Sequence, residues 1–364
     1  MAERDPYVDF LRSASLVVVV VWHWVFTILI VSTDSVTPTN PIGFTRGLWV
    51  ATWVLQVMPV FFFVGGFAHR RAFDKYVPGT SRRFLKRRIR RLLVPAFGLI
   101  GLWVAIGYVL EATIDPAWTW PAVVLVLSPL WFIAVYVVLV LIAPLAIRAH
   151  WRWGELVLVW LLGLAGVLDV LRFTHGQAWA AWLNFLVIWG LSHQLGFFYD
   201  RFIAAPVRTG WMMFWGGFFA LVALTNMGFY PRSQVGVPGE RFSNMGPPTL
   251  TIVALTFLQV GLVLVVRPWV MERLESRERW RTAFSWVNEN SLPLYLFHTT
   301  GFAIALSVIF LATDYLPPGS SNGEWWLTRP LWLVAPALAT WPILIAYRRL
   351  MQRAPQEQRP RSSV

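Results

Sequence analysis

The sequence contains no cysteine among its 364 residues, which excludes a disulfide framework and thiol chemistry. It also lacks H-E-x-x-H, P-loop and G-x-G-x-x-G motifs, so metal-dependent hydrolysis, ATP use and dinucleotide binding have no support. Charged residues make up only 13% of the chain. Within the apolar segments the only carboxylates are Glu155 and Asp169, both near predicted helix ends. Ion-coupled transport usually needs a deep carboxylate, so this distribution argues against it.

Apolar residues, by contrast, are abundant. The chain is 57% hydrophobic with a mean hydropathy of +0.57, which excludes an ordinary soluble domain. Because apolar runs of about 20 residues are typical of transmembrane helices, we expect an all-α polytopic membrane protein. The ten predicted helices span residues 13–32, 47–68, 92–110, 122–147, 155–171, 179–198, 209–227, 249–267, 292–311 and 330–347. The fourth contains Pro129, so we expect it to be kinked or tilted.

The basic residues are unevenly distributed. A formal net charge of +13 could indicate a nucleic-acid partner, but 26 of the 31 Lys and Arg residues lie on one predicted side of the membrane. Cytoplasmic loops are enriched in these residues. We therefore expect a multi-pass protein of the cytoplasmic membrane, with both termini in the cytoplasm and no nucleic acid bound.

The chain is predicted to form one membrane-embedded domain, residues 1–352, followed by a polar, disordered cytoplasmic tail, residues 353–364. One predicted outer loop, 228–248, is rich in Gly and Pro. Two interpretations stay open for this loop. It either folds over a substrate entrance from the outside or forms a solvated connection.

The first predicted helix carries titratable groups, which are costly and rare inside an apolar span and usually functional. Asp5 and Pro6 are typical of a helix start. Arg12 and His23 are eleven residues apart, so they share one helix face about 16 Å apart, and Asp9 lies near the same stripe. A charged pair at the membrane surface below an imidazole at mid-bilayer depth suits a ligand with an anionic head and a long reactive arm. Alternatively, Asp9 and Arg12 simply pair at i,i+3 and remain at the interface.

His23 is the candidate catalytic base. Burial favours the neutral imidazole, which is the form that activates a hydroxyl. The alternative is a histidine that bonds a neighbouring helix for packing. An orienting partner must come from another helix. His298 is one candidate, although packing is the preferred interpretation there, while His69 is expected at the interface and His193 has no assigned role.

A basic segment leads into the third predicted helix. Arg87 with Arg90, and Arg88 with Arg91, each form an R-x-x-R pair on one helix face. Arginine side chains bind phosphate well, so these four are candidate donor-binding residues. The alternative is a basic juxtamembrane helix that attracts anionic lipid headgroups.

Together these blocks resemble the acyltransferase 3 family of bacterial membrane proteins. The resemblance covers residues 4–347 and rests on blocks that follow in order: Arg4-x4-Asp9-x-Leu11-Arg12 with ten residues before His23, Pro59–Phe67, Phe84…Arg88-x-x-Arg91…Pro95, Leu130-Trp131-Phe132…Pro144 and Ser291–His298. One departure is visible, since the second block often ends Ser-Gly-Phe and here reads Gly65-Gly66-Phe67. Any role of that serine is not carried over.

The resemblance implies an O-acyltransferase that moves an acyl group, commonly acetyl, from acyl-CoA to a hydroxyl. The acceptor would be a glycan, glycolipid or secondary metabolite, and no metal is expected. His23 matches the family's catalytic histidine and Arg12 its partnered arginine, while Arg88 and Arg91 match arginines thought to face the donor. We expect these four to face one cavity open to the inside, with Trp131 as a wall. A lipid or glycan transporter without chemistry is the competing hypothesis.

Overall fold

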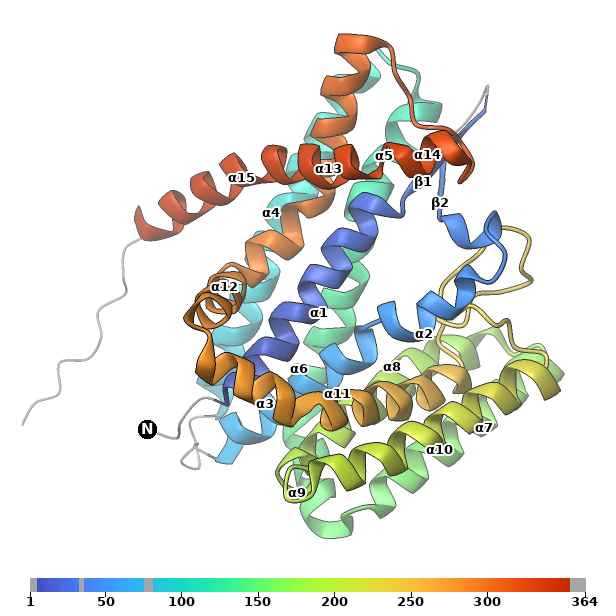
Figure 1. Cartoon of the computed structure of the whole chain (residues 1–364), viewed down its shortest axis with the longest axis vertical. Coiled ribbons are helices and arrows are strands. Elements are labelled where there is room, and N and C mark those ends of the chain that lie inside the picture. Colours follow the sequence, from blue (N-terminus) through green and yellow to red (C-terminus); the bar gives the residue numbers. More distant parts are fainter. Residues whose placement is uncertain (1–4, 33–35, 75–80, 354–364) are drawn as a thin grey trace, which may run out of the picture.

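The computed structural model describes residues 5–32, 36–74 and 81–353, and it is almost entirely helical (Figure 1). The elements, in chain order, are α1 (Pro6–Val25), β1 (Ile28–Val31), β2 (Val36–Thr39), η1 (Pro41–Gly43), η2 (Leu48–Val50), α2 (Ala51–Leu55), α3 (Met58–Asp74), α4 (Ser81–Glu111), α5 (Pro116–Leu127), η3 (Ser128–Leu130), α6 (Trp131–Trp153), α7 (Leu156–Thr174), α8 (Ala178–Leu195), η4 (Gly196–Phe198), α9 (Tyr199–Phe202), α10 (Pro206–Met227), α11 (Leu250–Ser276), α12 (Glu278–Glu289), α13 (Ser291–Thr313), α14 (Gly323–Leu327) and α15 (Arg329–Arg353).

The described residues contain nine helical segments that are long and apolar enough to cross a membrane, so the prediction of an all-α polytopic fold is confirmed. The predicted helix 179–198 is α8, which is not one of the nine. It carries four buried polar side chains that lower its hydropathy, namely Asn184, Ser192, His193 and Gln194. The tail that we predicted to be disordered lies, from residue 354 onward, outside the described residues.

The bundle has two distinct ends. At one end Arg71 pairs with Asp200 at 2.9 Å, and Arg201 pairs with Glu155. We call this the basic end. The other end carries strands β1 and β2 together with segment 228–248, and we call it the hairpin end. That the basic end faces the cytoplasm stays a prediction from the charge distribution.

Helix α1 runs through the middle of the bundle (Figure 1). It begins where the sequence indicates, because the side chain of Asp5 accepts hydrogen bonds from the backbone N–H groups of Tyr7 and Val8. The predicted extension of this helix to residue 32 is wrong. It ends at Val25, and the apolar run continues as strand β1, which pairs antiparallel with β2. Residues that favour strands are present in both segments, but Val17–Val21 are also β-branched and lie inside α1. The strand therefore depends on the nearby partner Val36–Thr39, with which it pairs.

Two predicted helices are interrupted. The fourth breaks at the 3-10 turn η3 around Pro129, as its proline indicates. The second breaks between α2 and α3, next to Gln56. The Gln259 side chain donates to the carbonyl oxygens of Trp53 (3.0 Å) and Gln56 (2.9 Å) at this break. Backbone groups freed inside a membrane need such partners, so Gln259 stabilises the irregular turn.

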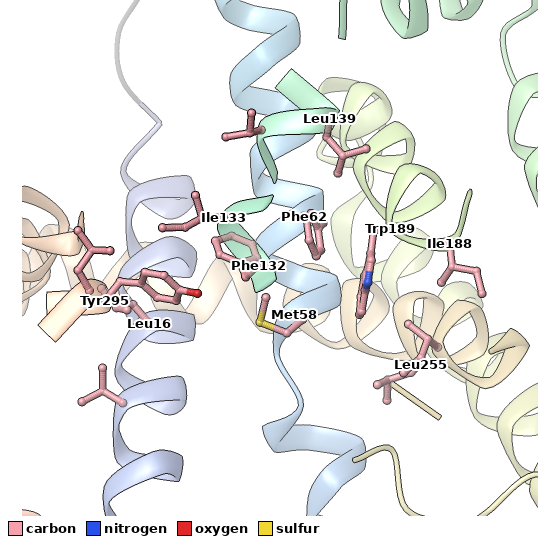
Figure 2. Close-up of a cluster of buried hydrophobic side chains, with 14 of the residues drawn as sticks. Leu16, Met58, Phe62, Phe132, Ile133, Leu139, Ile188, Trp189, Leu255 and Tyr295 are labelled. Carbon is pink, nitrogen blue, oxygen red and sulfur yellow. The ribbon is translucent and has the colours of Figure 1, made fainter. Parts of the chain in front are cut away.

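An apolar core lies between the central helices, and Figure 2 shows its large side chains. Phe62 of α3 stacks on Trp189 of α8, with ring centroids 4.8 Å apart. Phe132 of α6 packs against both Phe62 and Tyr295 of α13. The α1 residues Leu16, Val20 and Trp24 belong to the same apolar cluster, which therefore packs the second half of α1 against these helices.

Helix α10 packs closely on α11 through glycine. A Cβ at Gly217 would lie 2.3 Å from the backbone nitrogen of Leu258, and one at Gly261 would lie 2.3 Å from that of Phe214. Small residues permit this close approach of two membrane helices. The opposite face of α10, which includes Ala220, is exposed.

Candidate functional site

His23 lies in the last turn of α1, beside His298 of α13. Nδ1 of His23 is 3.1 Å from Nε2 of His298, and the two ring centroids are 4.9 Å apart. His298 is fully buried, and its backbone oxygen accepts a hydrogen bond from Nε1 of Trp24 at 2.8 Å. The orienting partner of His23 that the sequence left open is therefore a second histidine.

The contacts of this pair define where its protons lie. Nδ1 of His298 is 2.7 Å from the carbonyl oxygen of Tyr295, which can only accept, so that nitrogen carries a proton. In a neutral ring Nε2 of His298 is then an acceptor, and Nδ1 of His23 donates to it. The same Nδ1 lies 2.9 Å from the carbonyl oxygen of Val19, which also requires a donor. Nε2 of His23 is consequently the nitrogen with a free lone pair, the form that a general base requires.

His23 lines a small pocket at the hairpin end, which we call the polar pocket. Its volume is about 170 Å³, and its walls are mostly apolar. The name refers to three side chains among them that can form hydrogen bonds, namely Asn40, Thr52 and Gln56. Trp131 lines the same pocket, as do the segment 228–248 residues Val235, Gly236 and Met245. The structure thus brings His23 and Trp131 together, and it supports the first interpretation of segment 228–248, which covers this pocket.

Segment 228–248 is anchored by a buried carboxylate. Asp169 accepts hydrogen bonds from the Tyr230 hydroxyl, the backbone N–H of Leu250 and the Asn184 amide, each at 2.9 Å. Burial, followed by the charge on Asp169, raises the pKa of Tyr230 above its ordinary value. The tyrosine therefore remains a hydrogen-bond donor, and the anchor holds the segment over the polar pocket.

His23 also lines a second cavity of about 670 Å³, which we call the apolar chamber. It lies between α4, α5 and α13. Its walls consist mainly of apolar side chains, including Trp103, Ile106, Leu110, Leu125, Val126, Phe302 and Leu306. A single imidazole therefore borders a pocket with hydrogen-bonding groups and a chamber with mostly apolar walls.

A third cavity, which we call the arginine cleft, opens at the basic end between α4, α13 and α15. It has a volume of about 1350 Å³ and is lined by Arg87, Arg90, Arg91 and Arg348 together with Ser291, Asn290 and Tyr347. The guanidinium groups give it the character of a site for phosphate groups. The carboxylate of Glu289 also lines the cleft.

The comparison with protein families decides between the hypotheses for this arrangement. A family model described as an acyltransferase domain, that of acyltransferase 3, matches residues 5–348. The chain belongs to the acyltransferase 3 family. The resemblance drawn from the sequence is thus confirmed, and the protein is a membrane-embedded acyltransferase. Comparison with curated proteins and with solved structures gave no match.

The cavities of this acyltransferase divide the predicted site residues into groups. His23 and Trp131 share the polar pocket, while Arg87, Arg90 and Arg91 line the arginine cleft. These are distinct cavities in the structure, so a single channel that joins them stays a prediction. Among the described residues, no group of three or more His, Asp or Glu side chains could hold a metal ion.

Arg12 and Asp9 pair with each other. The Nη2 of Arg12 lies 3.1 Å from Oδ1 of Asp9, and both side chains are about one-third exposed. This is the i,i+3 arrangement that was the alternative interpretation of these residues. Neither side chain lines the polar pocket, the apolar chamber or the arginine cleft.

Arg88 points away from the arginine cleft and into a buried polar network. Its Nη2 donates to the Tyr136 hydroxyl at 3.0 Å, and that hydroxyl lies 3.2 Å from Nε2 of His69. Nδ1 of His69 is in turn 2.7 Å from Nε2 of His193. The side chain of His69, which we expected at the membrane interface, is only 4% exposed and lies inside the protein; its depth in the membrane stays a prediction. The sequence signal for this network is Tyr136, a tyrosine within the apolar first half of α6.

The network explains the departure in the second sequence block. A Cβ at Gly65 would lie 2.9 Å from Cε2 of Tyr136, closer than ordinary contact. Glycine at this position makes room for the Tyr136 ring, whose hydroxyl contacts Arg88. In this acyltransferase the ring of Tyr136 occupies space that the Cβ of a serine at position 65 would need.

Proposed function

We propose that this acyltransferase moves an acyl group from acyl-CoA to a hydroxyl of a glycan, glycolipid or secondary metabolite, with His23 as the general base. The observation that carries the proposal is the position of His23, whose ring is oriented by His298 and borders two cavities, one with hydrogen-bonding side chains among its walls and one with almost wholly apolar walls. Transferring an acyl group requires a base at the meeting point of acceptor and donor.

The proposed reaction uses the unprotonated Nε2 of His23. This nitrogen removes the proton of the acceptor hydroxyl while the hydroxyl oxygen attacks the thioester carbonyl. The new C–O bond forms, the C–S bond breaks, and CoA leaves as a thiolate. The imidazolium then returns its proton to the thiolate. His298 supports the imidazolium, since its Nε2 faces the Nδ1–H of His23.

The donor is proposed to bind from the basic end. Arg87, Arg90 and Arg91 offer charge-assisted hydrogen bonds to the phosphates of CoA. Their cleft and the apolar chamber are both bounded by α4 and α13, so a long arm that follows these two helices leads toward His23. Because the basic end carries the excess of Lys and Arg, this route starts in the cytoplasm, where acyl-CoA is found.

The acceptor is proposed to enter the polar pocket from the hairpin end. Asn40, Thr52 and Gln56 line this pocket and already donate hydrogen bonds within the protein, to Gly236, Trp49 and Met245 respectively. Each amide has a second N–H and further acceptor capacity, which suit the hydroxyl groups of a sugar. Segment 228–248 forms one wall and would shield the reacting groups from water. Membrane lipids surround the helices on this proposal, and no nucleic acid or metal takes part.

The test is thiol release by the purified protein in lipid nanodiscs. Because the chain has no cysteine, a thiol reagent detects only CoA. Acetyl-CoA and longer acyl-CoAs should release CoA faster when an extract of cell-envelope glycans and lipids is added, and mass spectrometry should find the acylated acceptor. His23→Ala should abolish both signals. Movement of a lipid or glycan across the membrane of liposomes that contain the purified protein, without CoA release, would instead support the transporter hypothesis.

A further inference from the structure

We propose that the apolar chamber holds the hydrocarbon chain of the donor's acyl group, so that the preferred donor carries a chain longer than acetyl. This inference rests on the proposed function and specifies its substrate class. It differs from what the family resemblance implies, in which acetyl is the common group.

The size and lining of the chamber are the first argument. Apolar cavities of about 150 Å³ already exclude water and take up apolar ligands. The chamber is about 670 Å³, and side chains such as Ile106, Leu125, Phe302 and Leu306 form its walls. The chamber is open at the side where Val308 and Leu311 are 59% and 82% exposed, so an acetyl group at His23 would leave most of this space to membrane lipid. A hydrocarbon chain of several carbons would fill it.

The second argument is the order of the cavities along α4 and α13. The arginine cleft ends at Leu102 on α4 and Phe297 on α13, and the chamber begins at Trp103 and Thr299. Nε1 of Trp103 donates to Oγ1 of Thr300 at 3.0 Å, at the junction of the two cavities. If the phosphates of the donor lie in the cleft, its arm must therefore run past the Trp103–Thr300 hydrogen bond to reach the chamber.

The third argument is the position of His23 at one end of the chamber. Its partner His298 directly precedes the chamber residues Thr299 and Thr300, so the imidazole lies at the end of the chamber nearest the cleft. From His298 to Leu311, the last α13 residue of the lining, the helix rises about 20 Å. A thioester carbonyl at His23 would thus direct its acyl chain away from the phosphates and along this length.

The experiment measures binding of CoA and of acyl-CoAs with 2, 4, 8, 12 and 16 carbons to the full-length protein in nanodiscs. Each buried CH₂ contributes about 0.8 kcal/mol, so affinity should rise roughly tenfold for every two carbons until the chamber is filled. Empty nanodiscs correct for partition of long chains into lipid.

Two substitutions on one helix face should shorten the preferred chain by different amounts. Ala303 and Ser307 both line the chamber and are one turn apart on α13. Ala303 is nearer to His298. In Ala303→Phe the affinity should therefore stop increasing at a shorter acyl chain than in Ser307→Phe. The matched control is Ala220→Phe on the exposed face of α10, which should leave the profile unchanged. Ala122→Phe, in the α5 wall, provides a further filling variant if Ala303→Phe fails to fold.

The outcomes separate the inference from the proposed function. The inference is supported if the phenylalanine variants prefer progressively shorter acyl chains while their affinity for CoA itself is unchanged. If CoA and acetyl-CoA bind but longer chains gain nothing, or the filling variants keep the wild-type profile, the inference is overturned and the donor assignment stands. The same conclusion follows if filling the chamber weakens binding of a polyprenyl phosphate probe and spares every acyl-CoA, because the chamber would then hold the acceptor's lipid. If no CoA species binds, the proposed donor fails as well.

Discussion

Nε2 of His298 lies 3.1 Å from Nδ1 of His23, although the two residues are 275 positions apart in the chain. The contact joins the last turn of α1 to α13 and links the imidazole to the Tyr295 carbonyl oxygen through His298. Both ring nitrogens of His298 are used in this chain of contacts. His298 is therefore a positioning residue on the proposed mechanism, and it acts through His23.

Replacing His23 by alanine should lower turnover by about 10²–10⁴, the usual contribution of a general base. Binding of CoA should change little, since the arginine cleft does not include His23. Turnover is measured by CoA release with a saturating acceptor extract, and folding by thermal unfolding of the purified variant. If His23→Ala retains near wild-type turnover, His23 is not the general base.

Replacing His298 by leucine should lower turnover about tenfold, as expected for loss of one orienting hydrogen bond. His298→Gln should retain more activity, because its amide can still accept from His23 and donate to the Tyr295 oxygen. The double variant with His23→Ala should be no slower than His23→Ala alone, since the two residues act as one unit. If His298→Leu and His298→Gln lower turnover equally, His298 has only a packing role.

How much of this site could be predicted depends on how local each feature is. The start of α1 follows from Asp5 and Pro6, which are adjacent in the sequence and form a cap by themselves. The break at Pro129 is equally local. The pairing of His23 with His298 depends on how α1 and α13 pack, and no spacing within one helix indicates it. The contact of Arg88 with Tyr136 is unpredictable for the same reason.

The error at the end of α1 has a different origin. The run from Ile28 to Val31 is apolar, and hydropathy alone does not separate a helix from a strand. The available signal was the matching segment Val36–Thr39, because β-branched residues alone also occur inside α1 at Val17–Val21. The hairpin moves His23 from the middle of the expected helix to its last turn, beside the polar pocket.

Removing the arginines of the cleft should weaken donor binding. Arg87, Arg90 and Arg91 are exposed, so each phosphate contact is screened by solvent and contributes less than the 1.5–3 kcal/mol of a shielded charged hydrogen bond. Alanine at all three should still weaken CoA binding at least tenfold by calorimetry, and more at low salt. Arg208→Ala, an exposed arginine on α10, is the matched control. Equal CoA affinity in the triple variant would favour the lipid-headgroup interpretation.

Alanine or serine at position 65 should disturb the Arg88 network. Either Cβ would meet the Tyr136 ring, so the ring must move and its hydroxyl must shift relative to Arg88 and His69. We expect Gly65→Ala and Gly65→Ser to lower the unfolding temperature and turnover by similar amounts. Higher turnover with serine than with alanine would show that a hydroxyl at this position has a role of its own.

The anchor of segment 228–248 should be needed for stability. Tyr230→Phe removes a hydrogen bond to a buried carboxylate and should lower the free energy of unfolding by about 1.5–3 kcal/mol. Tyr108→Phe, at an exposed tyrosine of α4, is the control. A loosened anchor should also raise the KM for acceptor more than that for acyl-CoA, because the segment lines the polar pocket.

The same anchor predicts a pH dependence. Burial and Asp169 raise the pKa of Tyr230, so the folded protein holds the proton more tightly than the unfolded chain. The contribution of Tyr230 to the free energy of unfolding is therefore fully present below pH 10, the ordinary pKa of tyrosine, and declines as the pH rises above that value. The difference in unfolding temperature between wild type and Tyr230→Phe should stay constant up to about pH 9 and shrink in more alkaline buffers. If the difference in unfolding temperature instead grows with pH, Tyr230 does not stabilise the protein as a hydrogen-bond donor to Asp169.

His23 borders the polar pocket and the apolar chamber at once, and this has a kinetic consequence. On the proposed assignment, acceptor and donor meet at one imidazole without exchanging places, so both are bound when the acyl group moves. Steady-state rates should then give intersecting double-reciprocal lines, because no acyl-enzyme is stored between two half-reactions. CoA would depart toward the basic end and the acylated product toward the hairpin end. A cell could thus decorate molecules on one face of its membrane with acyl groups activated on the other.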